Sequence, residues 1–569
     1  MKKWLSLLLA LCMALTLSLS FAEGAEDTWT EDSLAEAADI RTEIGDDYTG
    51  KTVILHSNDV HGQLDGYAWI AGLRTEFESR GANVILVDAG DFSQGTVYVS
   101  TTKGSTAVDM MNAAKYDLVT LGNHEFDFGY VQLMDNLSKA EFKTLCANVT
   151  LDETGEPILP GTCVQEYTFE DGTGLKIGFF GLETPETATK VNPGLVSMIT
   201  FSAFDKLYES AQKAIDELKS QQVDLTIGLV HLGVDAESKA NGYRSLDLLE
   251  KTTGADLLID GHSHTVMTAG PNGEPIVSSG TRFEYVGAIV IDHASKQIED
   301  RFLIPTYLGS KLYEAKFVDE SVLATAKDIM AKVDAEYSTA FATTEVDLNG
   351  DRAPGNRTEE TNLGDMITDA MVWSVVKEGG IEQVEPNAVV GITNGGGIRA
   401  PIPAGEFSRK DINTVLPFGN TVAVVYVTGA ELLEVLEAST FCTPDPIGGF
   451  PQTSGIQWTL DTTKAYDQGA VYMMNGKETS YYAPASINRV TITAINGEPF
   501  DPSATYAVVT NNFCTAGGDT YNVFGQSTST FDTGIPLDNA LMSYVEEVLQ
   551  GVVSAETYGA PQGRLTIIQ

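Results

Sequence analysis

The hexapeptide "GNHEFD", residues 122–127, follows directly on the apolar run "YDLVTL" of residues 116–121. A short apolar run that is rich in Val and Leu is typical of a buried β-strand. Polar and ionisable side chains therefore stand where this strand should end. In an α/β sheet, ligands bind at the carboxyl ends of the strands. We expect a functional site at these side chains: Asn123, His124, Glu125 and Asp127.

The same pattern recurs in the segments "VILHSNDVHG", "VILVDAGDFSQG", "LTIGLVHLG" and "LLIDGHSH". Each is an apolar run followed by polar or glycine residues, and helical patterns such as residues 201–220 lie between several of them. Buried strands that alternate with helices predict a layered α/β domain, which we place at residues 50–312. The polar groups at these further strand ends are Asp59, His61, Asp91, His231, His262 and His264.

Together with Asn123, these side chains form a set of oxygen and imidazole donors without sulfur. Such donors suit Zn, Mn, Fe, Co or Ni rather than a structural zinc knot. Seven ligands are too many for one open catalytic ion, but they fit two divalent ions that share a bridging carboxylate. Two such ions can activate water and hold a phosphoryl oxygen. The chain has seven His in total, and only His56 and His293 lie outside this set and its neighbour His124.

The net charge of −44 over 569 residues should repel nucleic-acid polymers and anionic membrane surfaces. A small anionic substrate would need local cations. Residues 1–22 predict a signal peptide, because Lys2 and Lys3 precede a short apolar segment and a small-residue cleavage site. A membrane anchor is the alternative, but the apolar run is short for a bilayer span. We therefore expect a secreted or periplasmic protein with no stable membrane anchor.

Residues 23–49 are acidic and polar, and predict a flexible lead-in that could contain a short helix. Four cysteines follow the signal peptide, and both disulfides and free thiols remain open: Cys146, Cys163, Cys442 and Cys514.

The second half of the chain has a different pattern. Residues 313–342 predict a connector, most of it an amphipathic helix, and residues 343–569 predict an α+β domain. Three segments of this domain stand out: "NGGGIRAPIPAG", "LPFGN" and "NNFCTAGGDTY". Consecutive glycines let a backbone approach something flat or phosphorylated, although they also occur in simple tight turns.

The order of the five strand-end motifs resembles the calcineurin-like metallophosphoesterases. With the second half included, residues 50–569 resemble the 5′-nucleotidase family, which includes bacterial periplasmic UDP-sugar hydrolases and animal ecto-5′-nucleotidase. The resemblance implies an N-terminal four-layer α/β/β/α metallophosphoesterase domain, a connector helix and a C-terminal α+β substrate-specificity domain. It also implies that one domain rotates against the other to open and close the site.

The resemblance further implies a role for each strand-end residue. One ion would be held by Asp59, His61, Asp91 and His264, and the other by Asp91, Asn123, His231 and His262. The family often has Gln or Asn where this chain has His264, which can also coordinate a metal. His124 and Asp127 would form the catalytic pair, since Asp127 can orient the imidazole and favour its charged form. Glu125 could be functional or only a turn residue.

For the second domain, the resemblance implies a nucleotide pocket. Phe418 and Phe513 would stack on the base, and Asp519 would accept hydrogen bonds from the ribose hydroxyls. Asn394 and Arg399 would reach the ribose–phosphate end. Other candidate substrate-binding residues, of which the two arginines match the family less closely, are Asn420, Arg352 and Arg357.

The sequence thus predicts an exported metal-dependent 5′-nucleotidase that hydrolyses nucleoside 5′-phosphates by metal-activated water. Its cofactors would be two divalent ions, such as Zn, Mn or Co, and its substrates could extend to nucleoside di- and triphosphates or UDP-sugars. One alternative is a 2′,3′-cyclic-nucleotide 2′-phosphodiesterase with 3′-nucleotidase activity. Another is a non-catalytic extracellular nucleotide-binding protein, which the complete ligand set disfavours.

Overall fold

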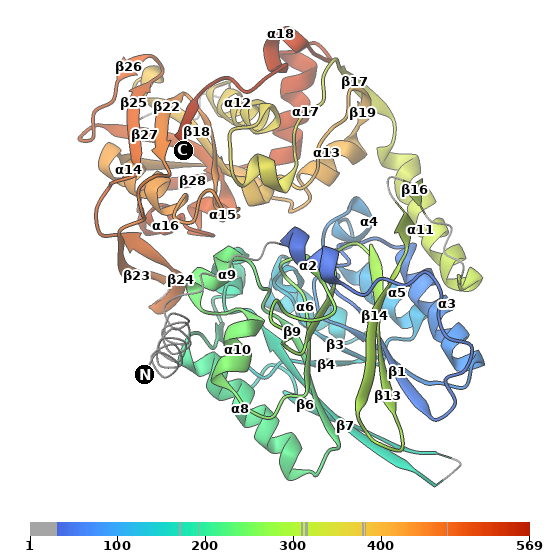
Figure 1. The fold of residues 1–569 in the computed structure, drawn as a ribbon. Helices are drawn as coiled ribbons and strands as arrows, with labels where there is room; N and C mark the ends of the chain where they lie inside the picture. The colour runs from blue at the N-terminus through green and yellow to red at the C-terminus, as the bar shows by residue number, and fades with distance from the viewer. Residues whose placement is uncertain are drawn as a thin grey trace, which may run out of the picture.

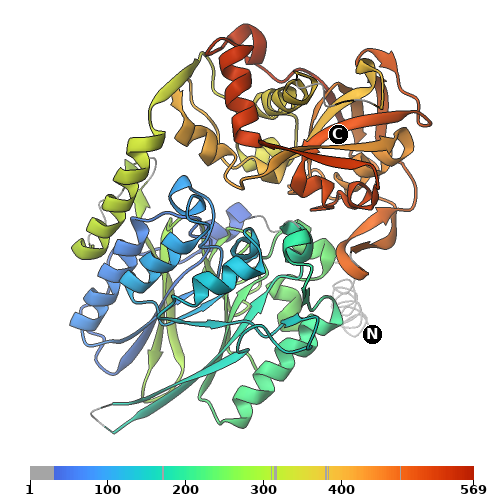
Figure 2. The same cartoon turned by 180° about the vertical axis from the view of Figure 1, so that it is seen from behind.

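A computed structural model describes residues 31–169, 172–191, 193–308, 311–312, 317–377, 381, 383–474 and 476–569. The predicted signal peptide lies outside these residues. Two domains are stacked one above the other, and the helix α11 (Glu320–Tyr337) runs along one side of the pair (Figures 1 and 2).

The first domain is built on two six-stranded sheets. One sheet has the order β14 (Ile298–Pro305), β13 (Tyr285–Asp292), β1 (Lys51–Ser57), β2 (Asn83–Asp88), β3 (Leu118–Thr120) and β4 (Lys143–Leu145). The other has the order β11 (Val266–Met267), β12 (Ile276–Ser279), β10 (Leu257–Asp260), β9 (Leu225–His231), β7 (Gly174–Glu183) and β6 (Thr162–Thr168).

The two sheets pack face to face through a shared core, to which Ile54 and Ile85 contribute from one sheet and Phe179 and Leu229 from the other. Helices α3 (Gly66–Ser79) and α5 (Ser105–Ala114) cover the outer face of the first sheet. Helices α8 (Asp205–Ser220) and α10 (Ser245–Lys251) cover the second. The predicted four-layer α/β/β/α domain is therefore confirmed.

Parallel pairing brings the predicted strand ends to one edge of each sheet. In the first sheet Ser57 lies opposite Asp88, so β1 and β2 end side by side. In the second sheet Glu183 at the end of β7 lies opposite His231 at the end of β9. These central strands are buried along almost their whole length, as expected for strands covered on both faces. Their polar residues are confined to the ends, where the site lies.

The lead-in differs from the expectation of a flexible segment. Residues 31–49 contain the helix α2 (Glu31–Ala37), and Leu34, Ile44 and Tyr48 are buried. Arg41 also forms ion pairs with Asp300 on β14, with a shortest distance of 2.6 Å. The acidic composition hid these few apolar anchors, which fix the segment to the first domain.

The connector helix α11 begins at the N-cap Asp319, whose carboxylate accepts hydrogen bonds from the backbone of Ser321 and Val322. Near its other end, Asp334 accepts a 2.9 Å hydrogen bond from Tyr98 of the first domain. The same carboxylate pairs with Lys410 of the second domain at 2.7 Å. The helix therefore contacts both domains at a shared polar junction.

The second domain is α+β, as predicted. Its central sheet has the order β21 (Pro451–Ser454), β18 (Val389–Asn394), β27 (Thr505–Asn511), β20 (Thr421–Thr428) and β28 (Thr530–Pro536). Helices α12 (Asn362–Lys377), α13 (Arg409–Val415) and α17 (Leu537–Glu547) pack on one face. The other face is covered by α14 (Gly429–Ala438) and a sheet of β26 (Glu498–Pro499), β25 (Val490–Ile495), β22 (Ile456–Asp461) and β30 (Leu565–Ile568).

A hairpin of β23 (Gln468–Met474) and β24 (Lys477–Pro484) leaves this domain and reaches the first one (Figure 1). Lys477 donates to the carboxylate of Asp152 at 2.7 Å and to the carbonyl of Ile199 at 2.8 Å. The four cysteines that follow residue 31 are free thiols. Within the described part of the chain, the helices are too short or too polar to cross a bilayer.

Candidate active site

The backbone of the strand-end loops turns sharply at the predicted metal ligands. Five of the seven predicted metal ligands have a positive φ: Asp59, His61, Asp91, His262 and His264. Residues other than glycine rarely adopt this left-handed conformation, which costs on the order of 1–3 kcal/mol each and persists where the surroundings enforce it. The sharp turns aim the side chains back over the ends of the strands.

The first cluster joins Asp59, His61 and His264. The Nε2 atoms of His61 and His264 lie 3.0 Å apart, and Asp59 Oδ1 lies 3.9 Å and 3.6 Å from them. The Nδ1 atom of His61 lies 3.2 Å from the carbonyl of Gln94, which fixes the ring so that Nε2 faces the cluster. Burial lowers the pKa of both histidines well below the usual range. Burial therefore favours the neutral form of these two rings, which is the form that binds a metal.

The second cluster joins Asp59, Asp91 and His231. His231 Nε2 lies 3.2 Å from Asp91 Oδ2 and 3.9 Å from Asp59 Oδ1. Its Nδ1 lies 2.7 Å from the carbonyl of Ala89, an arrangement that commonly orients histidine ligands. The Nε2 atom is buried and makes no hydrogen bond to the described residues. A buried nitrogen that faces carboxylate oxygens without a hydrogen bond fits a metal ligand, so the residues fit the predicted cofactor.

Asp91 belongs to the second cluster and also lies close to His61 of the first. Its Oδ2 atom is 3.9 Å from His61 and 3.2 Å from His231. Burial alone would raise the pKa of Asp91, but His231 and His124 outweigh it and lower that pKa well below the usual range. A carboxylate in this position can serve two ions at once, as the sequence predicts.

His262 joins the site through two contacts. Its Nδ1 atom lies 2.9 Å from Oδ1 of Asn123, and its Nε2 atom lies 3.1 Å from Oε2 of Glu186. Glu186 also accepts a 3.1 Å hydrogen bond from Asn241. Sequence reasoning missed Glu186, because it follows the strand β7 in the segment "GLETPET", which carries no histidine. A carboxylate that holds a ligating histidine fixes its ring and raises its basicity.

His124 and Asp127 form the pair that the sequence predicts. Nδ1 of His124 lies 2.8 Å from Oδ2 of Asp127. Burial opposes a charge on this imidazole, but Asp127 and Asp91 outweigh it and raise the pKa of His124. Its Nε2 atom lies 4.0 Å from Asp91 Oδ2. The pair therefore presents a proton donor next to the candidate metal ligands.

Glu125 has a structural role in this loop. Its carboxylate is buried and accepts hydrogen bonds from the backbone N–H groups of Gly122, Asp91, Phe92 and Ser93, at 2.6–2.9 Å. It therefore locks the loop after β2 to the loop after β3. These hydrogen bonds fix the position of Asp91 relative to Asn123.

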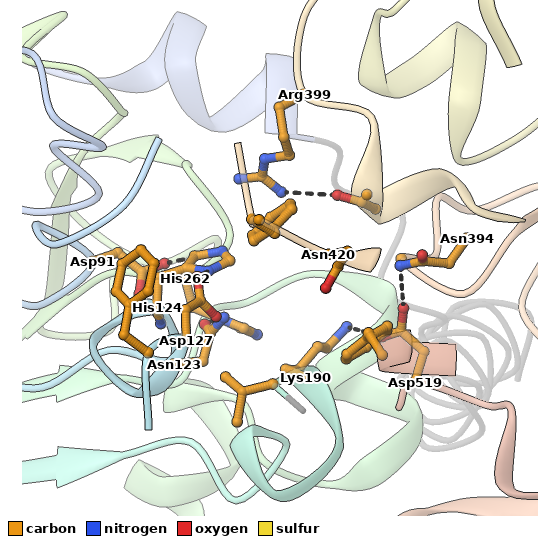
Figure 3. A pocket seen from close by; sticks show the side chains of 18 of the residues that line it. Asp91, Asn123, His124, Asp127, Lys190, His262, Asn394, Arg399, Asn420 and Asp519 are labelled. Carbon is orange, nitrogen blue, oxygen red and sulfur yellow. Dashed lines mark hydrogen bonds and ion pairs between the residues drawn. The ribbon is translucent and has the colours of Figure 1, made fainter. Parts of the chain in front are cut away.

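A cavity of about 330 Å³ lies between the two domains, and residues of both line it (Figure 3). The first domain contributes Asp91, Asn123, His124, Asp127, His262 and His264. The second contributes all eight predicted substrate-binding residues: Arg352, Arg357, Asn394, Arg399, Phe418, Asn420, Phe513 and Asp519. The structure thus brings together groups that are up to 428 residues apart in the sequence, Asp91 and Asp519.

The two halves of the cavity touch through Phe418. Its ring centroid is 5.6 Å from that of His124, and the guanidinium carbon of Arg399 is 5.7 Å from the same ring. Burial lowers the pKa of Arg399 to about 10, so it is still charged at neutral pH. It supplies a local cation in a strongly acidic chain.

Arg352 connects the two domains through an ion pair. Its guanidinium pairs with Asp235 of the first domain at 3.1 Å. Asp235 also caps the helix α9 (Ala236–Asn241) by accepting a hydrogen bond from the backbone of Ser238. This ion pair closes one side of the cavity, and the sequence carried no signal for it.

The three consecutive glycines, residues 395–397, were expected to approach a flat or phosphorylated group, but they also hold loops of the second domain together. An added Cβ at Gly395 would lie 1.9 Å from the carbonyl of Asn356, so this glycine is required by packing between two loops. The backbone N–H groups of Gly395 and Gly396 donate to the carbonyls of Phe450 and Gly448, at 2.7 Å each. The glycines thus assemble the walls of the cavity, which Gly396 and Gly397 line.

Fold and site together define a metal-dependent phosphoesterase. Residues 52–266 match the family model of the calcineurin-like phosphoesterases, and residues 340–526 match that of the 5′-nucleotidase C-terminal domain. The chain carries both of these domains and belongs to the 5′-nucleotidase family.

Similar proteins agree with this assignment. The chain is 31% identical over 84% of its length to the trifunctional nucleotide phosphoesterase protein YfkN of Bacillus subtilis, but spans only 33% of that protein. It is 27% identical to the snake venom 5′-nucleotidase of Crotalus adamanteus, over 90% of this chain and 88% of that one. The crystal structure of a 5′-nucleotidase precursor from Thermus thermophilus matches with a TM-score of 0.72 and 28% identity, over 91% of this chain and 99% of that one.

Proposed function

We propose that this protein is an exported enzyme that hydrolyses nucleoside 5′-monophosphates to nucleoside and phosphate with two bound divalent ions. The observation that carries the proposal is the cavity between the domains. The first domain lines it with candidate metal ligands and with His124 and Asp127, and the second domain lines it with Phe418, Phe513 and Asp519. The first set suits a phosphate and the second a nucleoside, which are the two parts of a nucleotide.

The ions would be held by Asp59, His61, Asp91 and His264 on one side, and by Asp91, Asn123, His231 and His262 on the other. When bound, they supply activation of water and neutralisation of phosphoryl charge. The left-handed loops and the orienting contacts to Gln94, Ala89 and Glu186 fix the ligand atoms before any ion arrives.

The remaining residues act on the substrate directly. His124, whose pKa Asp127 and Asp91 raise against the effect of burial, stabilises negative charge on a phosphoryl or leaving oxygen and can donate its proton to the leaving group. Arg399, Arg352 and Arg357 place positive charge beside the phosphate and shield it from the general repulsion of the acidic surface.

Phe418 and Phe513 offer aromatic faces for a base, and such stacking tolerates any base. Asp519 offers acceptors for the ribose hydroxyls, while Asn394 and Asn420 complete the polar wall of the cavity. Opening and closing of the domains would admit the substrate, because the cavity is shared between them. Export is supported by the signal-like residues 1–22 and by the similarity to a venom 5′-nucleotidase.

Phosphate release from a nucleotide panel tests the proposal. Purified protein is supplied in turn with Mn²⁺, Co²⁺, Zn²⁺ and Mg²⁺, and is assayed on AMP, ADP, ATP, a UDP-sugar and 2′,3′-cyclic AMP. The proposal predicts that AMP is hydrolysed, with activity abolished by EDTA and restored by metal. Preference for 2′,3′-cyclic AMP would instead make the protein a cyclic phosphodiesterase, and equal rates with and without metal would refute the metal-dependent mechanism.

A further inference from the structure

Lys190 reaches the nucleoside end of the cavity from the metal-binding domain. It is the last residue of the short helix α7 (Thr187–Lys190) and lines the cavity. Its ammonium nitrogen lies 3.7 Å from Oδ1 of Asp519 in the other domain, and the side chains of both residues are largely buried. Figure 3 shows the two side chains meeting on the side of the cavity away from the candidate metal ligands.

The position of Lys190 is tied to the metal-binding residues. Its backbone N–H donates to the carbonyl of Glu186 at 2.8 Å, one helical turn earlier. The carboxylate of that same Glu186 contacts His262. A single turn therefore links the candidate metal centre to Lys190, over a rise of about 6 Å.

Asp519, on the other side of this contact, is also held in place by hydrogen bonds. Asp519 has a φ of 48°, and its backbone N–H donates to the carbonyl of Thr189 in the other domain at 2.6 Å. Its Oδ2 atom accepts a 3.0 Å hydrogen bond from Asn394. Gly448 leaves room for the pair, since an added Cβ there would lie 3.3 Å from the Lys190 nitrogen and 3.4 Å from Asp519 Oδ1.

We propose that Lys190 is a specificity-determining residue that, together with Asp519, recognises the two neighbouring hydroxyls of a ribose. This inference rests on the proposed function. A carboxylate only accepts hydrogen bonds and an ammonium only donates them, whereas each ribose hydroxyl does both. An acceptor and a donor side by side therefore complement a vicinal diol, one hydroxyl donating to Asp519 while accepting from Lys190. A deoxyribose leaves one partner of this pair without its hydroxyl.

The inference also explains how closure is linked to the nucleoside. Lys190 and Asp519 belong to different domains, so the diol site is complete only when the domains are closed. A phosphate ester without a ribose can reach the metals but gains nothing from Lys190. The contribution of Lys190 should therefore depend on the sugar, not on the phosphate.

The test compares Lys190→Met, Lys190→Arg and the control Lys206→Met, which removes an exposed lysine of α8. Each is assayed with the metal that activates the wild type, on AMP, 2′-deoxy-AMP and p-nitrophenyl phosphate. Lys190→Met should raise the KM for AMP about tenfold, the scale of one hydrogen bond to a charged group. The preference for AMP over 2′-deoxy-AMP should fall by a similar factor, because a site built for a hydroxyl rejects the analogue that lacks it.

Hydrolysis of p-nitrophenyl phosphate should stay within twofold of the wild type in all variants, and Lys190→Arg should retain part of the preference for AMP. An unchanged ratio of AMP to 2′-deoxy-AMP in Lys190→Met would overturn the inference, as would an equal loss on all three substrates. A wild type that cleaves p-nitrophenyl phosphate but no nucleotide would overturn the proposed function and the inference with it.

Discussion

Replacing Glu186 by Gln should weaken the binding of one metal ion while leaving the fold intact. Glu186 is buried, and its two oxygens contact His262 at 3.1 Å and Asn241 at 3.1 Å. Glutamine has the same volume, and its oxygen can keep the bond to Asn241. Its NH₂ group, however, would then face the ring nitrogen of His262 that the carboxylate now contacts. The variant loses both the acceptor and the negative charge that orient this imidazole.

The magnitude follows from the contact that is lost. Removing an orienting partner of a metal ligand typically costs 10–100-fold in metal affinity, or about 1.4–2.8 kcal/mol. Calorimetric titration of metal-free protein with Mn²⁺ measures this directly, with Glu209→Gln on the exposed face of α8 as the matched control. The affinity of one site should fall by that factor in Glu186→Gln only. Affinities within twofold of the wild type would refute the assignment of Glu186.

Three further predictions address the catalytic pair, the base site and the core. His124→Ala should lower kcat by about 100-fold or more with unchanged metal content; a loss of less than about threefold in a steady-state assay would contradict its role. Phe418→Ala should raise the KM for AMP by about 30-fold, which corresponds to the middle of the ~1–3 kcal/mol of a base stack, and should affect glycerol 2-phosphate, which has no aromatic ring, much less; parallel losses on both substrates would contradict base stacking. Burial lowers the pKa of His56 to about 3, so its contribution to stability is complete above the unfolded pKa of about 6.5 and is lost as the pH falls toward 3. Between pH 7.5 and pH 5, the free energy of unfolding measured with urea should therefore fall by about 2 kcal/mol less in His56→Leu than in the wild type. An equal fall in both proteins would count against this explanation.

The fold was predictable because buried strands have a strong signal. The apolar runs before Asp59, Asp91, Asn123 and His231 form strands that pair in parallel with their neighbours in two mixed sheets, and the ends of these strands meet at one edge. The apolar patterns were enough to predict these strands, and the chemistry of the donor atoms was enough to predict the candidate metal ligands at their ends.

Other features depend on contacts between distant segments, which a local pattern cannot show. Glu186, Lys190 and Asp235 lie in loops or short helices without a motif, and their partners are far away in the sequence. The same holds for Glu125, whose four backbone partners belong partly to another loop. The docking of residues 31–49 was missed because a few apolar anchors are diluted by acidic residues.

The central claim is that the loop ends gather a pair of divalent ions, and counting bound ions tests it most directly. Purified protein is equilibrated with Mn²⁺, freed of excess metal and measured by elemental analysis, alongside Asp91→Ala. Two ions per wild-type chain and fewer than one per chain in the variant would agree with a bridging carboxylate. A wild type that retains no ion, or a variant that retains both, would contradict the account.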